Sequence, residues 1–389
     1  MKRSLVTIDS TILPPDDEAV RTAMPVFVIE NHGLSEKNVV LKGRSFAEIA
    51  AGMDGTNAKW DAIGQKSVSS FFSNGGEVCY VLLSRHLHVN FQKKAFRLAE
   101  VERDVPEATL LVAPETYGYL GNWTTLLTDA ATSNRLFCLI DLPENTGDAF
   151  SEITKFTAEL SESAKSAGAA YWPYLIERSV SDGKILESTV APSAAAAAAI
   201  QRTDATSGVW GAPANVRLPA VLRPISHTSH PDLLEKGANT VRTFPGRGAL
   251  LWGARTMVSD TKSPTAYIQT KRTITFIQNG LQAQLRPMVF DVNNALLWRT
   301  CEARVTAYLT EIWRAGGLAG ATANAAFSVQ VGEGITMTAE DIAQGKLIMA
   351  VSFTLHPILT AVKLALTMRQ GESHIAVTDV SATTQGATQ

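Results

Sequence analysis

Five continuous apolar runs in the first half of the sequence alternate with segments of helical character. They are MPVFVIE (24–30), GEVCYVLLS (76–84), ATLLVAPE (108–115), RLFCLIDLPE (135–144) and AAYWPYLIE (169–177). A strand that is apolar on both faces must be covered on both faces, and the helical segments between the runs can supply that cover. The pattern therefore predicts a mainly parallel sheet between two layers of helices, which is an α/β fold.

Turn and cap signals between these runs agree with this fold. Ser45 is placed to open a short helix, and the glycine pair 75–76 is placed to close another. SVSDGKIL (179–186) has Asp-Gly between two strand-like stretches, which predicts a hairpin. The alanine run 194–199 predicts a helix with so little side-chain volume that it can pack close to the sheet.

The pattern changes from about residue 270 onward. RTITFIQNGLQAQ (272–284) predicts strand, turn and strand, and residues 294–317 predict an amphipathic helix closed by a glycine pair. After that helix the sequence predicts strands in AFSVQV, KLIMAVSFTLHP and LALTMRQ, with the turn-like TAEDIAQG between the first two. We expect a separate α+β module here. The apolar residues of its helix are Leu297, Trp298, Cys301, Val305, Tyr308, Leu309 and Ile312.

Each end of the sequence carries one short strand pattern beside tether-like residues. LVTI (5–8) is followed by the proline- and acid-rich STILPPDDEAV, and SHIAVTDV (373–380) is followed by the polar SATTQGATQ. Frayed termini are the ordinary interpretation of such ends. The alternative is that each strand pairs with a sheet elsewhere.

Charge and composition exclude several functional classes. A net charge of −2 argues against non-specific binding of nucleic acid, which needs a basic excess. Cys79, Cys138 and Cys301 lie far apart inside apolar runs, so we interpret them as buried thiols rather than a disulfide framework or a metal cluster. Asp9 interrupts the first apolar stretch, and no stretch approaches the roughly eighteen apolar residues of a membrane span. We expect a chain that folds in the cytoplasm and does not insert into a membrane.

The search for catalytic motifs gives little. The sequence contains no P-loop, HExxH, CxxC or GxSxG pattern. Ser193 suits a helix N-cap as well as a nucleophile, and Asp141 and Glu115 end strands without a suitable base or nucleophile beside them. His227 and His230 form an HxxH without an acidic or cysteine partner, which is typical of solvated loop histidines. We therefore expect no catalytic, cofactor or metal site.

Several blocks of the sequence, in this order, resemble the tail sheath proteins of contractile phage tails and related contractile injection systems. They are FFSNGGEVCYVLLSR (71–85), VAPSAAAAAAIQRTDATSGVWGAPAN (190–215), LLEKGANTVRTFPGRGALLWGARTM (233–257) and NNALLWRTCEARVTAYLTEIWRAGGLAGATANAAFSVQV (293–331), followed by DIAQGKLIMAVSF (341–353). The family pattern has lysine where this chain has Gly211, and alanine where it has Gln201.

The resemblance implies a subtilisin-like α/β sheath domain without a catalytic triad, followed by a C-terminal α+β domain, with extended N- and C-terminal β-arms. The implied division is an N-terminal arm (1–24), the sheath domain (25–270), a tube-facing domain (271–372) and a C-terminal arm (373–389). It also implies a function: subunits polymerise as stacked hexameric rings and contract to drive an inner tube through a target cell envelope. The implied partners are further copies of the chain, the inner tube protein, and baseplate and terminator or cap proteins, with no nucleic acid. Assembly is expected in the bacterial cytoplasm, as part of a phage tail or a released phage-tail-like particle.

Three groups of residues take on roles through the resemblance. The arms exchanged between subunits contain Leu5, Val6, Thr7, Ile8, His374, Ile375, Ala376 and Val377. The tube-facing residues are Arg299, Arg304 and Arg314, which outnumber Glu302 and Glu311 on the same helix. A structural loop that packs under the sheet contains Arg202, Asp204, Trp210, Pro213 and Asn215. The alternative function is a doubly wound α/β hydrolase or nucleotide-binding enzyme.

Overall fold

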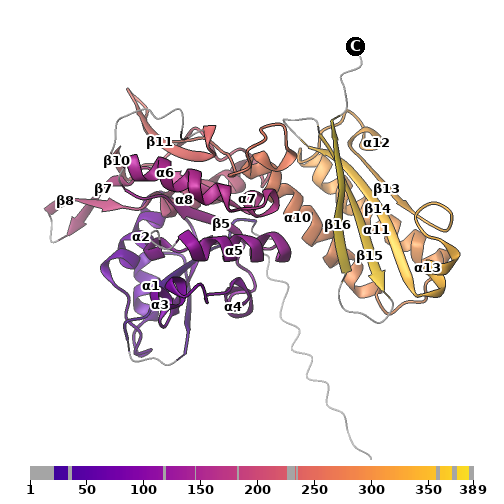
Figure 1. Ribbon diagram of the computed structural model, residues 1–389, viewed down its shortest axis with the longest axis horizontal. Coiled ribbons are helices and arrows are strands. Elements are labelled where there is room, and N and C mark those ends of the chain that lie inside the picture. Colours follow the sequence, from indigo (N-terminus) through magenta and orange to yellow (C-terminus); the bar gives the residue numbers. More distant parts are fainter. Residues whose placement is uncertain are drawn as a thin grey trace, which may run out of the picture.

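The computed structural model describes residues 22–33, 37–116, 120–144, 146–181, 184–225, 233, 235–355, 360–369 and 375–384. Two bodies lie side by side, and helix α10 (Ile268–Leu285) runs between them (Figure 1). The larger body contains the first half of the sequence, and the smaller body contains the C-terminal strands (Figure 1).

A nine-stranded sheet forms the middle of the larger body, in the order β2-β3-β1-β4-β5-β6-β11-β12-β9. The strands from β3 to β11 in this order run parallel, whereas β2, β12 and β9 are antiparallel to the strands beside them. The mainly parallel sheet predicted from the sequence is thereby confirmed. Its strands are β1 (Pro25–Glu30), β2 (Val39–Gly43), β3 (Cys79–Ser84), β4 (Leu110–Val112), β5 (Phe137–Asp141), β6 (Gly168–Trp172), β9 (Val216–Arg217), β11 (Ala238–Phe244) and β12 (Gly248–Trp252).

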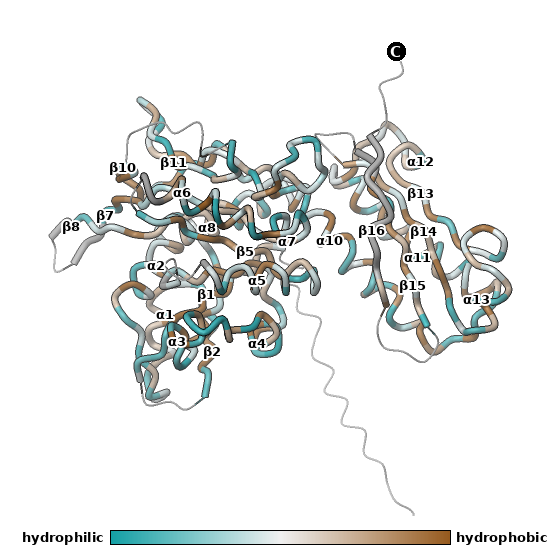
Figure 2. Tube along the Cα trace, in the orientation of Figure 1, coloured by the Kyte–Doolittle hydropathy of each residue, from teal (hydrophilic) through white to brown (hydrophobic). Residues whose placement is uncertain are grey.

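Successive residues of a strand point to opposite sides of the sheet, so the apolar strands give this sheet two apolar faces. Helices cover both of these faces. In β1, for example, Val26 and Val28 enter one core while Phe27 and Ile29 enter the other. Figure 2 shows the hydrophobic residues along these inner strands. The first core is covered by α3 (Leu87–Gln92), α4 (Leu98–Asp104), α5 (Leu120–Ser133), α6 (Thr146–Ala158) and α7 (Glu162–Ser166), and the second by α1 (Phe46–Gly52), α2 (Ala62–Ser73) and α8 (Pro192–Ser207).

Helix α8 contains the alanine run, and its first ten residues, Pro192 to Gln201, are buried. Each of the six alanines from Ala194 to Ala199 is 0% exposed. Side chains this small let the helix backbone approach the strands closely, so the interior is filled without large side chains. The alanine run therefore brings backbone close to backbone, as the sequence suggested.

The run AAYWPYLIE was predicted as one strand, and this prediction is wrong. Its first part is β6, and its second part begins β7 (Leu175–Ser181), which belongs to a different, three-stranded sheet. Pro173 separates the two, and proline cannot donate to a strand ladder. In that second sheet β7 pairs with β8 (Lys184–Val190), as the Asp-Gly signal predicted, and with β10 (Val221–Pro224).

The segment 272–284 was predicted as strand, turn and strand, but it lies within the single helix α10. Its β-branched residues and its Asn-Gly pair are local signals for strands and turns, which tertiary packing overrides. The apolar residues recur at helical spacing and form one buried face. They are Ile274, Ile277, Leu281 and Leu285.

The smaller body packs α10 and α11 (Ala295–Arg314) against a four-stranded antiparallel sheet in the order β13-β14-β15-β16. The predicted amphipathic helix is confirmed as α11, and its buried residues are Leu297, Cys301, Val305, Leu309 and Ile312. The turn-like TAEDIAQG contains a short helix, α13 (Ala339–Ala343), which follows another short helix, α12 (Ala323–Ala326). The strands are β13 (Phe327–Val331), β14 (Lys346–Leu355), β15 (Thr360–Arg369) and β16 (Ile375–Thr384).

Strand β16 differs from the expectation for a C-terminal arm. It pairs antiparallel with β15 of the same chain, from Met368 opposite Ile375 to Thr360 opposite Thr384. The edge of β15 offers unpaired backbone groups, and within a single chain the adjoining C-terminal segment is the nearest strand that can satisfy them.

Candidate functional site

Asp141 and Ser193, which the sequence analysis considered separately, lie together in the structure. Asp141 ends β5, and its carboxylate accepts hydrogen bonds from the Ser193 amide (2.8 Å) and the Ser193 hydroxyl (2.7 Å). Burial raises the pKa of Asp141 to about 7. The N-cap residue of α8, Ala191, has no side-chain cap of its own, so Asp141 caps this helix from a neighbouring strand. Both polar groups of Ser193 are thus used in a structural contact.

The other candidates for chemistry do not join this pair. Glu115 lies in a 3-10 turn, Pro114–Thr116, and its side chain falls outside the described part of the structure. His227 and His230 also lie outside the described residues. Among the residues that the structure does describe, no group of three or more metal-ligating side chains converges, and no helix is long and apolar enough to cross a membrane.

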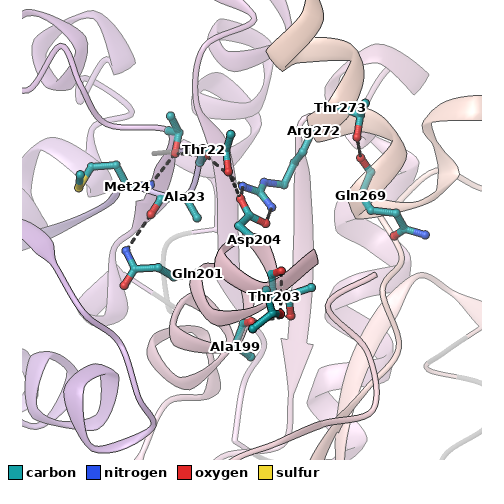
Figure 3. A network of polar contacts seen from close by, with 12 residues as sticks. Thr22, Ala23, Met24, Ala199, Gln201, Thr203, Asp204, Gln269, Arg272 and Thr273 are labelled. Carbon is teal, nitrogen blue, oxygen red and sulfur yellow. Dashed lines mark hydrogen bonds and ion pairs between the residues drawn. The ribbon is translucent and has the colours of Figure 1, made fainter. Parts of the chain in front are cut away.

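The strongest polar cluster lies where the chain enters the larger body, and it joins three distant segments (Figure 3). The guanidinium group of Arg272 on α10 donates to both carboxylate oxygens of Asp204 on α8, at 2.6 and 2.8 Å. The two side chains are 4% and 6% exposed. Thr22 completes the cluster, because its hydroxyl donates to Asp204 and its carbonyl accepts from Arg272 at 3.1 Å.

Gln201, one turn before Asp204, fixes the starts of two strands. Its side-chain amide nitrogen donates to the carbonyls of Ala23 (2.8 Å) and Val78 (2.9 Å). Its side-chain oxygen accepts from the amides of Glu77 (2.7 Å) and Val78 (3.3 Å). One buried side chain thus holds the segments leading into β1 and β3. The predicted N-terminal arm runs to residue 24, yet its last residues, Thr22–Met24, belong to this packed junction.

Arg202 on α8 connects that helix to the NGG turn at residues 74–76. Its guanidinium group donates to the carbonyls of Asn74 (2.8 Å) and Arg217 (3.0 Å). Gly75 has a φ of +89°, and a Cβ atom there would lie 2.7 Å from the Arg202 side chain. Glycine at this position therefore permits both the left-handed turn and the close passage of the arginine.

The loop after α8 does not simply pack under the sheet as predicted, because Trp210 packs against the core of the smaller body. Cβ atoms placed at Gly208 and Gly317 would lie 2.5 and 2.6 Å from the Trp210 ring, so both glycines make room for it. Pro213 is buried, and the amide of Asn215 donates to the carbonyl of Leu251 at the edge of the large sheet. The loop is thus a contact between the two bodies.

The cationic side chains predicted to face a tube, Arg299, Arg304 and Arg314, are all exposed on α11. The acidic residues Glu302 and Glu311 are exposed on the same helix. Of the predicted arm residues, Leu5, Val6, Thr7, Ile8 and His374 lie outside the described residues, while Ile375, Ala376 and Val377 begin β16.

Three residues of the junction were not identified from the sequence: Thr22, Gln201 and Arg272. Arg272 stands in a segment whose sequence predicts a strand, whereas in the helix α10 it lies one turn after Gln269. For Gln201 the available signal is its position, because it is the first polar residue after the apolar run 194–200 and lies one helical turn before Asp204. A polar residue on a face that is otherwise fully buried needs partners, and it therefore marks a contact.

Comparison with known proteins gives consistent matches. Residues 260–371 match the family model of the phage tail sheath C-terminal domain. A chain in the contracted baseplate of the anti-feeding prophage is 28% identical with a TM-score of 0.75, and the match covers 92% of this chain and 94% of that one. A chain of the contracted helical sheath of the anti-feeding prophage is 27% identical with a TM-score of 0.69, and the match covers 90% and 97%.

A third structure belongs to an extracellular contractile injection system. A chain of the contracted PVC sheath complex is 26% identical with a TM-score of 0.69, and the match covers 86% of this chain and 88% of that one. No curated protein sequence matches this chain.

Proposed function

We infer that this chain is a sheath subunit of a contractile, phage-tail-like particle. The observation that carries this function is the match to the contracted helical sheath of the anti-feeding prophage, which extends over 90% of this chain and 97% of that chain. The match of residues 260–371 to the sheath C-terminal family model adds a second, independent finding. Both agree with the resemblance seen in the sequence blocks.

The proposed activity is mechanical and needs no catalytic group. Subunits assemble as stacked hexameric rings around an inner tube, and the stored energy is the free-energy difference between two packings of the same subunits. The use of Asp141 and Ser193 as a helix cap supports this proposal over the alternative of an α/β hydrolase or nucleotide-binding enzyme. Further copies of the chain and the baseplate are the first partners, and an inner tube and a terminator or cap protein complete the particle. We propose that it assembles in the bacterial cytoplasm.

The proposed arms connect neighbouring subunits by strand exchange. Nine of the ten residues of β15 pair with β16 within one chain, so the edge of β15 is able to receive a strand along nearly its whole length. In a polymer, the equivalent C-terminal strand of a neighbour can take this edge, and the N-terminal strand around Leu5–Ile8 can extend the same kind of sheet. Such ties hold while the bodies rotate.

The exposed face of α11 is proposed to meet the tube. Arg299, Arg304 and Arg314 give it a positive excess over Glu302 and Glu311. Exposed ion pairs of about 0.2–1 kcal/mol each are weak enough to be released on contraction. Charge reversal at Arg299 and Arg304 should reduce co-assembly with the tube protein at low salt, whereas reversal at the exposed Arg178 and Arg217 of the larger body should leave it intact. Unchanged co-assembly after the first pair of substitutions would count against this face.

Sedimentation of the purified full-length chain, followed by negative-stain microscopy of the pellet, tests the proposed function. A sheath subunit should sediment as a polymer and appear as hollow tubes or ring stacks. A discrete small oligomer in the supernatant, with no tubes, would favour the enzyme alternative.

A further inference from the structure

A cavity of about 140 Å³ opens beside the junction of Figure 3, between the larger body and α10. Its wall is mainly apolar, formed by Leu136, Phe137, Val209 and the half-buried Phe276. Arg135 and Lys271 also line it and bring two positive charges to its surroundings. Thr22, the first described residue of the chain, is part of the same wall.

We propose that this cavity is the docking site for residues 16–20 of the same chain, DDEAV, which are joined to Thr22 by the single residue Arg21. The side chains of Ala19 and Val20 fill the apolar wall, and the acidic residues Asp16, Asp17 and Glu18 lie toward Arg135 and Lys271. The segment is thereby a latch that anchors the root of the N-terminal arm to the junction of the two bodies.

Distance favours this segment as the occupant. Val20 precedes Thr22 by two residues, so its backbone lies within about 7 Å of a residue that lines the cavity. Thr22 itself is held from three sides, because Thr109 and Arg272 donate to its carbonyl and its own hydroxyl donates to Asp204. The chain therefore approaches the cavity from a fixed point, and docking residues 16–20 costs less entropy than docking a free segment.

Size and charge agree with the same occupant. An apolar cavity of about 150 Å³ holds a guest as large as benzene, so two small side chains such as alanine and valine are of suitable volume. The segment carries three acidic residues in succession immediately before this apolar pair. Acidic side chains followed by apolar side chains are complementary to a cavity that has Arg135 and Lys271 beside an apolar wall.

The latch sets the length of chain available for exchange between subunits. With residues 16–20 docked, only residues 1–15 can extend, and fifteen residues span at most about 50 Å. The proline pair 14–15 would then stand at the hinge between the docked root and the free strand. Docking itself does not depend on the proposed sheath function, since it occurs within one chain.

Cysteine cross-linking in the full-length chain tests the proposal. Val20→Cys with Thr275→Cys should form a disulfide under mild oxidation, and it should be intramolecular on a denaturing, non-reducing gel and by peptide mass. Ile8→Cys with Thr275→Cys is the matched control from the same arm and should give a much lower yield. The native Cys79, Cys138 and Cys301 are buried and should not react in the folded chain.

Two results would overturn the latch. The first is a yield for Val20→Cys no higher than for Ile8→Cys, and the second is a cross-linked dimer, which would assign the cavity to a neighbour's segment. Neutralising Asp16, Asp17 and Glu18 to Asn, Asn and Gln should lower the cross-linking yield about two- to fivefold at low salt, as expected for exposed ion pairs. Asp9→Asn should not lower it, and an equal loss in both variants would contradict the assignment of the acidic residues.

Discussion

The Asp204 carboxylate and the Arg272 guanidinium group form an ion pair that is almost completely removed from water, at 6% and 4% exposure. A buried charge is costly when it is left alone, whereas replacing both charges by apolar groups is often tolerated. This pair also binds Thr22, so a single contact links the entry of the chain to α8 and α10. The stability of the junction therefore depends on neither charge being left without the other.

We expect Asp204→Leu or Arg272→Leu alone to lower the free energy of unfolding by about 3–5 kcal/mol, because each leaves the other charge buried and unpaired. The double variant should recover most of this loss. Urea denaturation of each variant measures the effect. The exposed pair Arg223–Glu187, with side chains 45% and 55% exposed, is the control and should change stability by less than about 1 kcal/mol. Equal losses for the two pairs would contradict the buried role.

The Asp141 carboxyl predicts a specific pH dependence. Burial raises its pKa from 3.8 to about 7 in the folded chain, so the folded state binds this proton more tightly than the unfolded state does. The resulting stabilisation is fully present below the unfolded pKa and is lost as the pH rises through about 7. Relative to Asp141→Asn, the native chain should lose on the order of a few kcal/mol of unfolding free energy over this window.

Denaturation at several pH values from 4 to 8 measures that difference, and a difference independent of pH would show that Asp141 titrates at its ordinary value. Ser193→Ala provides a second check. The hydroxyl of Ser193 lowers the pKa of Asp141 by hydrogen bonding, so its removal should move the window to higher pH.

Which residues could be identified from sequence depended on how far away their partners lie. Asp204 and Trp210 belong to a conspicuous block and were identified, although Trp210 turned out to contact the smaller body. Thr22 and Arg272 were not, because their partner Asp204 is distant in sequence and only the fold brings the three together. Asp141 and Ser193 stood out as isolated chemical groups, and only their mutual hydrogen bonds reveal the helix cap.

At the scale of elements, α10 shows where local sequence signals fail. Its β-branched residues and its Asn-Gly pair predicted strands, yet its first buried residue, Ile268, joins the core of the larger body and its later ones join that of the smaller body. The central parallel strands were predictable because their apolar runs are continuous, and α11 because its apolar stripe is regular. Helix α10, which contacts both cores, has neither a continuous apolar run nor a regular apolar stripe along its whole length.

Gly280 on α10 lies against Tyr308 on α11, which gives a test of this helix pair. A Cβ atom at Gly280 would lie 1.9 Å from the Tyr308 hydroxyl oxygen and 2.3 Å from its Cζ atom. Gly280→Ala should therefore destabilise the chain by about 1–2 kcal/mol, since overpacking outweighs the gain of about 1 kcal/mol in helix propensity. Gly121→Ala on α5 is the control, because its Cβ atom meets only the flexible end of Lys94. The thermal unfolding midpoints of the two variants measure the difference, and a midpoint for Gly280→Ala no lower than that for Gly121→Ala would contradict the close contact with Tyr308.

The two ends of the chain should respond differently to truncation. Removing residues 371–389 takes away β16, leaves the edge of β15 unpaired and uncovers the core near Ile375, so the chain should lose stability and aggregate. Removing residues 1–15 should leave the thermal midpoint nearly unchanged. If strand exchange connects subunits, both truncations should abolish ordered polymers. A chain without residues 1–15 that still forms ordered tubes would contradict a role for the N-terminal strand.

At the scale of the whole molecule, the two bodies are joined by α10, by the buried ion pair and by the Trp210 contact. These contacts favour a subunit whose two bodies move as one unit during contraction. The fold class of both bodies was predictable from periodicity, but the sheet to which β7 belongs and the pairing of β16 within one chain were not. Pairing between segments depends on which edges are free, and a single sequence does not record that.

Electron cryo-microscopy of the polymer formed by the full-length chain tests the central claim most directly. We expect helical tubes of stacked rings whose subunits have this fold, with residues 271–372 nearest the lumen and strands exchanged between neighbours. A closed small oligomer, or tubes whose lumen is lined by the α/β body instead, would contradict it.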